Sequence, residues 1–270
     1  MIKTGYFQSN GSKLYYSMAC PENDANNAGI LFVHAADGNR LGPHRMYVEF
    51  ANEFNRLGFS TFRFDLSGHG DSFGDISNGN IEKDLADVKN AILFFIKTAK
   101  VEKVILFGIS RGAYLCCNAA AKYKLPLSGL MLLSLPVSSG KTALKKINHI
   151  LEDYIKRAFD PHNIRRLFTC RINFLQILKT IVKPILFGRI FPKMQTDTFT
   201  SRCHTIMIYG RCDPISESSS QYYSLIFEKN NVPCEIYNIE NANHSFFHYQ
   251  WKQQILDLCR SWLGKTQINE

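Results

Sequence analysis

The sequence predicts an α/β fold in which a mostly parallel sheet is covered by helices on both faces. Short apolar runs of strand type alternate with longer amphipathic segments along most of the 270 residues, and no internal repeat interrupts them. The composition, 45% hydrophobic and 20% charged, is sufficient for a full core. This length suits one such domain with an insertion, or at most two small domains.

The first half of the chain supplies the opening elements of this pattern. A hairpin is expected around Asn10-Gly11, because this dipeptide separates two short apolar runs. Pro43 is expected to open a helix that ends at Gly58. The other expected elements are strands over 29–33, 60–65 and 103–107, a glycine-rich loop over 67–72, and a helix over about 81–98.

The second half continues the alternation around one long exception. Strands are expected over 130–135, 205–209 and 234–239, with a helix after the strand that ends at 107 and two more over 216–229 and 247–263. The segment 138–201 instead has helical periodicity broken by prolines, which predicts a helical cap inserted into the sheet domain. We therefore expect a core domain over 1–137 and 202–270, and a cap over 138–201.

The predicted cap carries most of the net charge of +9, because it holds twelve Lys or Arg residues and only four Asp or Glu residues. One interpretation is a solvated helical face, and the other is attraction to an anionic substrate, carrier or membrane surface. Its apolar stripes favour packing against the core over insertion into a membrane. Nucleic acid is not an expected partner, because no binding motif accompanies the charge.

A pentapeptide, Gly108-Ile109-Ser110-Arg111-Gly112, lies between the expected strand over 103–107 and a helix. G-x-S-x-G between a strand and a helix is typical of a sharp turn that exposes a nucleophilic serine. Small flanking residues are needed because the backbone is strained there and passes close to itself. The start of the helix directs main-chain N–H groups and its positive dipole end toward a developing oxyanion.

Ser110 would need a base, and the base would need an orienting acid. Asp213 follows the strand over 205–209, and His244 lies in the loop after the strand over 234–239. The carboxyl ends of parallel strands meet at one edge of a sheet, so we expect all three side chains to lie close together there. Their order along the chain, Ser then Asp then His, suits this arrangement.

Other histidines and acids fit less well. His34 and His69 precede the serine, and His248 is expected within the last helix. Neither Asp197 nor Glu217 directly follows a strand. The strand over 130–135 is followed by no acid, which removes the commonest alternative position.

Together these motifs resemble the α/β-hydrolases, in the serine-hydrolase branch with serine aminopeptidase-like proteins, monoacylglycerol lipases and carboxylesterases. The resemblance covers about residues 12–264 and implies an eight-stranded, mostly parallel sheet. It rests on the His34 loop, residues 65–72, the pentapeptide at 108–112, Asp213-Pro214 and residues 243–246. More narrowly, residues 40–45 and 63–65 are similar to hydrolases associated with exosortase and polysaccharide-export loci in bacteria.

The resemblance implies hydrolysis of an ester, thioester or amide bond of a small-molecule acyl substrate through an acyl-serine, with no cofactor and no metal. By position, the main-chain N–H groups of Ala36 and Arg111 are the expected oxyanion donors. The family commonly has glycine after the loop histidine, where this chain has Ala35. Ala35, His44 and Arg45 are possible substrate-binding residues, although His44 and Arg45 equally suit the first turn of the following helix.

Two other functions remain open. A thioesterase or acyltransferase would use the same residues on a carrier-bound or coenzyme-bound acyl group, and the basic cap suits such a partner. A non-catalytic binding protein could also have this fold. A dehalogenase is less favoured, because its nucleophile would be an aspartate where Ser110 stands.

The cysteines and the N-terminus predict a cytoplasmic protein. Eight cysteines are scattered without a C-x-x-C pair, which is typical of reduced thiols rather than of disulfides or a zinc site. The first residues lack the apolar stretch of a signal peptide, and no segment has the length of a membrane-spanning helix. The acyl and leaving groups and the oligomeric state are not determined by these patterns.

Overall fold

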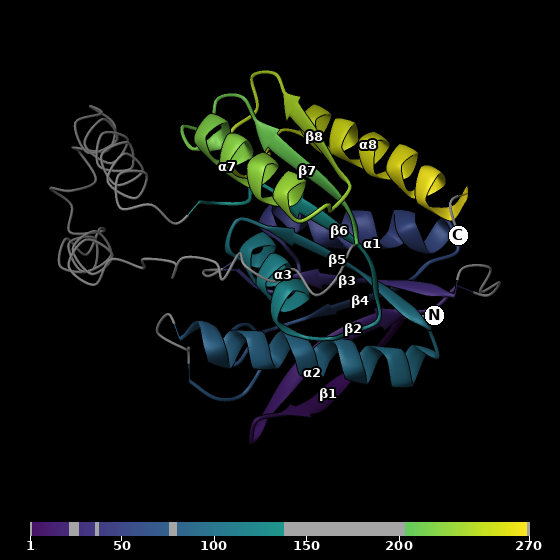
Figure 1. The fold of residues 1–270 in the computed structure, drawn as a ribbon. Helices are drawn as coiled ribbons and strands as arrows, with labels where there is room; N and C mark the ends of the chain where they lie inside the picture. Colours follow the sequence, from purple (N-terminus) through teal and green to yellow (C-terminus); the bar gives the residue numbers. More distant parts are fainter. Residues whose placement is uncertain (1, 22–26, 36–37, 76–79, 138–202, 269–270) are drawn as a thin grey trace, which may run out of the picture. The chain divides into compact units, whose positions relative to one another are not determined.

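The computed structural model describes residues 2–21, 27–35, 38–75, 80–137 and 203–268. Its centre is an eight-stranded sheet with the order β1-β2-β4-β3-β5-β6-β7-β8 (Figure 1). The strands are β1 (Ile2–Ser9), β2 (Ser12–Ala19), β3 (Ala28–Val33), β4 (Ser60–Phe64), β5 (Lys103–Ile109), β6 (Leu127–Leu133), β7 (His204–Gly210) and β8 (Cys234–Ile239).

Strand direction confirms the mostly parallel sheet. Only β2 runs antiparallel to its neighbours β1 and β4, and β1 and β2 form the expected hairpin around Asn10-Gly11. From β4 through β3, β5, β6 and β7 to β8, every neighbouring pair is parallel. The loops that follow β3, β5, β6, β7 and β8 therefore all lie at one edge of the sheet.

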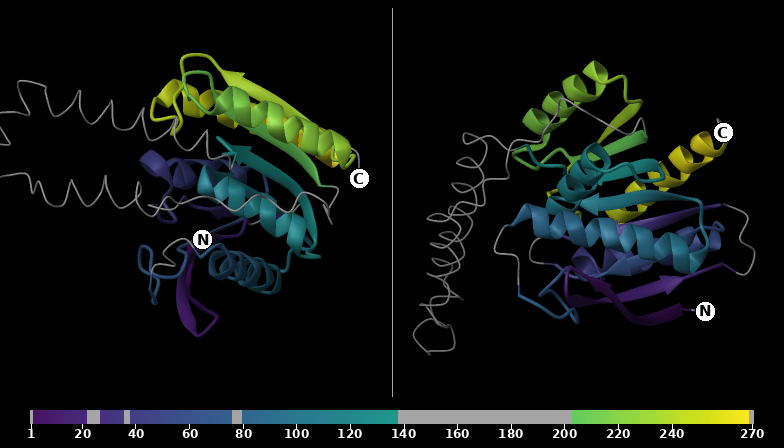
Figure 2. Two further views of the ribbon diagram at one scale, coloured as in Figure 1. Left: turned by 60° about the vertical axis from the view of Figure 1, so that its left-hand side comes forward. Right: turned by 60° about the horizontal axis from the view of Figure 1, so that its bottom comes forward.

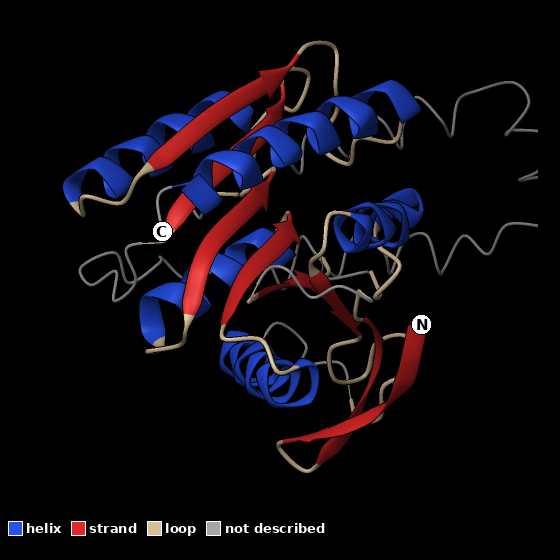
Figure 3. Ribbon diagram, turned by 90° about the vertical axis from the view of Figure 1, so that its right-hand side faces the viewer, coloured by secondary structure: helices blue, strands red, loops and turns tan. Residues whose placement is uncertain are grey.

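Helices cover both faces of the sheet, as the alternating pattern predicts. The helices are α1 (Met46–Arg56), α2 (Ile81–Ala99), α3 (Arg111–Lys122), α7 (Ser216–Lys229) and α8 (Tyr249–Ile268). Helices α1 and α8 lie on one face, and α2, α3 and α7 lie on the other (Figures 1 and 2). A view rotated by 90° about the vertical axis shows the strands between these two helix layers (Figure 3).

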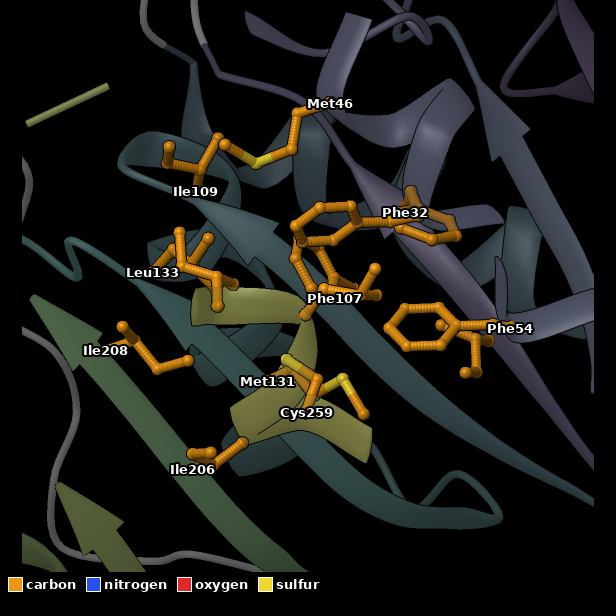
Figure 4. Close-up of a cluster of buried hydrophobic side chains, with 14 of the residues drawn as sticks. Phe32, Met46, Phe54, Phe107, Ile109, Met131, Leu133, Ile206, Ile208 and Cys259 are labelled. Carbon is orange, nitrogen blue, oxygen red and sulfur yellow. The ribbon is translucent and has the colours of Figure 1, made fainter. Parts of the chain in front are cut away.

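The core on the α1 and α8 face is built from the inward positions of the parallel strands. Alternate residues of β5, namely Ile105, Phe107 and Ile109, are buried there beside matching positions of β3, β6 and β7 (Figure 4). The Phe32 and Phe107 rings are 5.0 Å apart between their centroids, and both pack against aromatic residues of α1. This packing holds the carboxyl ends of the central strands in a fixed relation.

Two helices begin later than the sequence predicts. Pro43 opens a 3-10 turn over Pro43–Arg45 instead of the α-helix, because His44 and Arg45 have φ values of 50° and 60°. Left-handed residues cannot continue a right-handed helix, so α1 starts at Met46. Helix α8 starts at Tyr249, which leaves His248 just before it rather than inside it.

The predicted cap over 138–201 lies outside the described residues, so its boundaries and its helices remain predictions. No helix within the described part of the chain is long and apolar enough to cross a membrane. The seven cysteines of the described ranges are free thiols. Nor do those ranges contain a group of three His, Cys, Asp or Glu residues arranged to hold a metal ion.

Candidate active site

Ser110 lies at the turn between β5 and α3, where the sequence predicts it. Its φ of 54° and ψ of −121° are strained for a residue with a side chain. Its main-chain N–H donates a hydrogen bond of 2.8 Å to the carbonyl oxygen of Leu133, at the end of β6. The neighbouring strand thus holds the turn in this conformation.

The two glycines of the pentapeptide are explained by close backbone contacts. A Cβ atom added to Gly108 would lie 2.6 Å from the main-chain nitrogen of Ala113, in the first turn of α3. One added to Gly112 would collide with the carbonyl oxygen of Val33, at the end of β3. The helix can start directly beside both strands only because neither position carries a side chain.

Asp213 and His244 lie beside Ser110, so the structure brings together the three residues that the sequence singles out. His244 Nε2 lies 2.8 Å from Ser110 Oγ, and His244 Nδ1 lies 2.5 Å from Asp213 Oδ2. The Asp213 side chain is 3% exposed and that of His244 is 28% exposed. The second carboxylate oxygen of Asp213 accepts a hydrogen bond from the Ile215 N–H at 3.3 Å, which orients the carboxylate toward the imidazole.

The loops that carry Asp213 and His244 are hydrogen-bonded to each other. The Cys212 N–H donates to the carbonyl oxygen of Ala242 at 2.9 Å. A Cβ atom on Gly210, at the end of β7, would collide with that carbonyl and would lie 2.6 Å from the carbonyl oxygen of Asn243. The absence of a side chain at 210 therefore lets the histidine loop approach the aspartate loop.

Ser134, which follows β6, also contacts the histidine loop. Its side chain is fully buried and its φ is 45°. Its Oγ donates a hydrogen bond of 3.0 Å to the main-chain carbonyl of His244, and its N–H donates to the carbonyl of Ile208 on β7 at 2.9 Å. Ser134 thus connects the ends of β6 and β7 to the backbone of His244.

The loop after β3 is organised by His34, which is buried. Its Nε2 accepts a hydrogen bond of 3.0 Å from the Leu66 N–H, and its Nδ1 donates to the carbonyl oxygen of Ala35 at 2.7 Å. Burial lowers the pKa of His34 to about 4, which keeps the ring neutral near pH 7. Ala35 is half-buried, whereas Ala36, the expected oxyanion donor, lies outside the described residues.

The main-chain N–H of Arg111, the other expected oxyanion donor, lies at the start of α3. Its side chain turns away from solvent and is buried in an ion pair with Asp84 on α2, which is also buried. Two buried opposite charges fix the first residue of α3 against α2. The orientation of that N–H therefore depends on a contact with another helix.

His44 and Arg45, the possible substrate-binding residues, are exposed in the turn before α1. The His44 ring lies 6.2 Å from the ring of Phe247, which is three residues beyond His244. The turn thus contacts the loop that carries the histidine. Whether either residue binds a substrate stays a prediction.

Two residues of this site were not found by sequence reasoning. Gly210 could have been noticed, because it separates the last apolar residue of a strand from the loop with Asp213. Ser134 gave no signal, because a buried serine in a left-handed conformation is not distinguishable from an ordinary loop serine. Its role arises from a contact between residues 110 positions apart.

The chain matches a family model described as the alpha/beta hydrolase fold over residues 30–169. No curated protein sequence matches it. An esterase of Pyrococcus furiosus is similar in structure, with a TM-score of 0.72 and 18% identity over 98% of this chain and 90% of the esterase. The protein Est1E of Butyrivibrio proteoclasticus, solved with ferulic acid bound, has a TM-score of 0.65 and 18% identity over 98% of this chain and 99% of its own. An α/β serine hydrolase of Xanthomonas campestris, described as lacking a lid, has a TM-score of 0.62 and 15% identity over 97% and 94%.

Proposed function

The chain belongs to the alpha/beta hydrolase fold family, and from this premise we propose that it is a serine hydrolase that cleaves carboxylic esters through an acyl-serine intermediate. The observation that carries the proposal is the pair of contacts made by His244, at 2.8 Å to Ser110 Oγ and 2.5 Å to Asp213. A nucleophile, a base and an orienting acid in hydrogen-bond contact are what acyl transfer to serine requires.

Each side chain then has a defined step. Ser110 Oγ attacks the substrate carbonyl carbon while His244 Nε2 accepts the hydroxyl proton. Asp213 orients the ring through Nδ1 and stabilises its positive charge. His244 passes the proton to the leaving-group oxygen as the bond to the acyl carbon breaks. Water, activated by the same histidine, then releases the acyl group and restores Ser110.

The oxyanion of the tetrahedral intermediate is assigned to the main-chain N–H of Arg111, with Ala36 as the second donor. Arg111 supports this role because it is the first residue of α3, where N–H groups have no partner within the helix. The positive end of the helix dipole adds to the stabilisation of a negative oxygen there.

The family and the similar solved structures support the reaction class. The Pyrococcus furiosus protein is named an esterase and the Xanthomonas campestris protein a serine hydrolase. Both are similar to this chain over most of their length.

A fluorophosphonate probe tests the proposal directly, because it reacts covalently with an activated serine. We expect labelling at Ser110, found by peptide mass spectrometry, and hydrolysis of short 4-nitrophenyl esters. Ser110→Ala and His244→Ala should abolish both, whereas Ser220→Ala, on the exposed surface of α7, should change neither. Folded wild-type protein that resists the probe and cleaves no activated ester would rule the proposal out.

A thioester of an anionic carrier or coenzyme is the second candidate substrate, favoured by the twelve basic residues against four acidic ones in 138–201. Activity on an acyl-coenzyme thioester would then fall steeply with added salt. Replacing Arg165 and Arg166 with glutamine should reduce that salt dependence. A rate that does not respond to salt or to these changes would favour the simple ester.

A further inference from the structure

Arg63 on β4 is a buried cation that forms no ion pair with any residue that the structure describes. Its side chain is 8% exposed and lies at the carboxyl end of the strand. Within the described residues its guanidinium makes one hydrogen bond, from Nη1 to the main-chain carbonyl of Arg40 at 3.3 Å, and no ion pair within 4 Å. A guanidinium has five N–H donors, so most of its capacity is available to another group.

Arg63 lies in a cluster of three arginines, Arg40, Arg45 and Arg63, and two carboxylates, Asp65 and Asp71, which leaves one positive charge in excess. Arg40 lies beside it but is already paired, with Asp65 at 2.5 Å and with Asp71 at 2.7 Å. Arg45, which is exposed in the turn before α1, acts on Arg63 as a second like charge. Burial lowers the pKa of Arg63, and the positive charges of Arg40 and Arg45 lower it further, whereas the negative charge of Asp65 raises it.

The first acidic residue of α1 does not form an ion pair with Arg63 or Arg45. Glu49 lies one turn into the helix, but its carboxylate pairs with Lys252 of α8 at 2.6 Å and 2.8 Å. Among the described residues, the guanidinium groups of Arg45 and Arg63 therefore have no carboxylate partner. A buried or crowded cation is costly unless an anion joins it, and guanidinium matches the geometry of carboxylate and phosphate groups.

The loop that contains Arg40, the hydrogen-bond partner of Arg63, is held in place by hydrogen bonds within the protein. The Tyr47 N–H donates to the carbonyl oxygen of Leu41 at 3.1 Å, and the Leu41 N–H donates to Asn39 Oδ1 at 3.0 Å. The Tyr47 hydroxyl donates to the carbonyl oxygen of Val33 at 2.8 Å. A fixed loop lowers the entropy lost when a ligand binds.

Arg63 lies near the candidate active site, and Arg45 follows His44, whose ring contacts Phe247 of the loop after His244. In the sheet register, Arg63 on β4 pairs with Phe32 on β3, and Phe32 pairs with Phe107 on β5. Phe107 is three residues before Ser110. Two strand spacings and three residues along a strand correspond to about 14 Å between the Cα atoms of Arg63 and Ser110. A substrate of ordinary size spans such a distance.

We propose that Arg63 and Arg45 form an anion-binding subsite that receives a carboxylate or phosphate group of the substrate, away from the bond that Ser110 attacks. This inference rests on the proposed function only in that it takes the bound anion to be part of a substrate. Anion binding at the subsite depends only on charge and geometry, so it can be tested without catalysis. If the subsite receives part of the substrate, the preferred substrate is an ester that carries a negative charge at a distance from its acyl carbon.

Binding of glutarate and of inorganic phosphate to the Ser110→Ala protein, followed by calorimetry, tests the subsite alone. We expect one saturable site for at least one of the two anions, weakened at least tenfold by Arg63→Met and by Arg45→Gln. Arg63→Lys, which retains the charge, should lose less than Arg63→Met. Lys97→Gln, which removes one exposed positive charge near the far end of α2, should change nothing.

Arg45→Gln keeps the test decisive if Arg63→Met fails to fold, because Arg45 is exposed. The absence of binding to the Ser110→Ala protein, or binding of equal strength in the folded Arg45 and Arg63 variants, would overturn the proposal. Tighter binding of phosphate than of glutarate would assign the subsite to phosphorylated substrates, and the reverse to carboxylates.

Hydrolysis then links the subsite to the reaction. We expect mono-4-nitrophenyl esters of dicarboxylic acids, from succinate to sebacate, to include one with a KM at least tenfold below that of its methyl-capped neutral analogue. Arg63→Met and Arg45→Gln should remove this preference by raising the KM of the charged ester to that of its neutral analogue. Cleavage of neutral and charged esters with equal KM would refute the subsite and leave the proposed function standing. Failure to cleave any ester would refute the proposed function, and the binding measurement would then decide the subsite.

Discussion

The hydroxyl of Ser134 donates a hydrogen bond of 3.0 Å to the main-chain carbonyl of His244, although the two residues are separated by 110 positions in the chain. His244 is therefore held at two points, its ring by Asp213 at Nδ1 and its main-chain carbonyl by Ser134. Proton transfer to His244 depends on a separation of 2.8 Å from Ser110 Oγ. A small displacement of the histidine loop would lengthen that contact.

Ser134→Ala should lower kcat severalfold and leave KM nearly unchanged, because the hydroxyl positions His244 and does not contact substrate. The free energy of unfolding should fall by about 1 kcal/mol. Ser134→Gly separates two effects: glycine accepts the φ of 45° without strain, so stability should be kept while kcat still falls. Ser220→Ala, which removes a hydroxyl donor to the carbonyl of Glu217, is the matched control for kinetics and urea unfolding. A normal kcat in Ser134→Gly would show that the hydroxyl has no positioning role.

Gly210→Ala should reduce kcat/KM by about a hundredfold, the order of loss that follows a displacement of about 1 Å in an active site. The new Cβ would collide with the carbonyl of Ala242 and push the His244 loop away from Asp213. Gly264→Ala on α8 is the control, because a Cβ there meets nothing within 4 Å. Kinetics and thermal unfolding of both variants check this. Unchanged activity in folded Gly210→Ala protein would contradict the close approach of the two loops.

His34 should make the protein less stable in mild acid. Its pKa is lowered from 6.5 to about 4 by burial, so between these pH values the unfolded chain binds a proton that the folded protein does not. The contribution of the neutral His34 ring to the free energy of unfolding is therefore fully present above pH 6.5, and it falls by about 3 kcal/mol as the pH drops to about 4. Urea unfolding at a series of pH values measures it.

In His34→Gln, whose side-chain oxygen can still accept from the Leu66 N–H, stability should depend less on pH over this window. A pH dependence that matches the wild type would mean that other groups cause the acid sensitivity.

Asp84→Asn should destabilise the protein by roughly 3–5 kcal/mol, because it leaves the buried guanidinium of Arg111 without a countercharge. The double variant Asp84→Leu/Arg111→Met should recover most of this loss, since it removes both charges. Glu82→Gln, which breaks an exposed ion pair between the same helix and Lys122, should cost less than about 1 kcal/mol. Urea unfolding compares the three, and equal losses in Asp84→Asn and Glu82→Gln would argue against a buried ion pair.

Much of the fold could be predicted because strands and helices follow from the local pattern of apolar and polar residues. The apolar run before Ser110 and the helix-forming residues after it predict β5 and α3, and the structure places their boundaries within a few residues. The helix start at 43 was wrong, because left-handed residues at His44 and Arg45 delay α1 in a way that composition does not reveal. The start at 247 was wrong by two residues, since α8 begins at Tyr249.

The sequence alone determined the fold class and was enough to predict that Ser110, Asp213 and His244 lie close together, because each follows a strand and parallel strands bring their ends to one edge. Tertiary structure decided the rest. Only the folded chain sets Ser134 against the His244 carbonyl, pairs Arg111 with Asp84, and buries Arg63 where no carboxylate of the described residues forms an ion pair with it. The physical reason is that strand and helix periodicity depend on near neighbours in sequence, whereas hydrogen bonds and compensated charges depend on residues that meet only after folding.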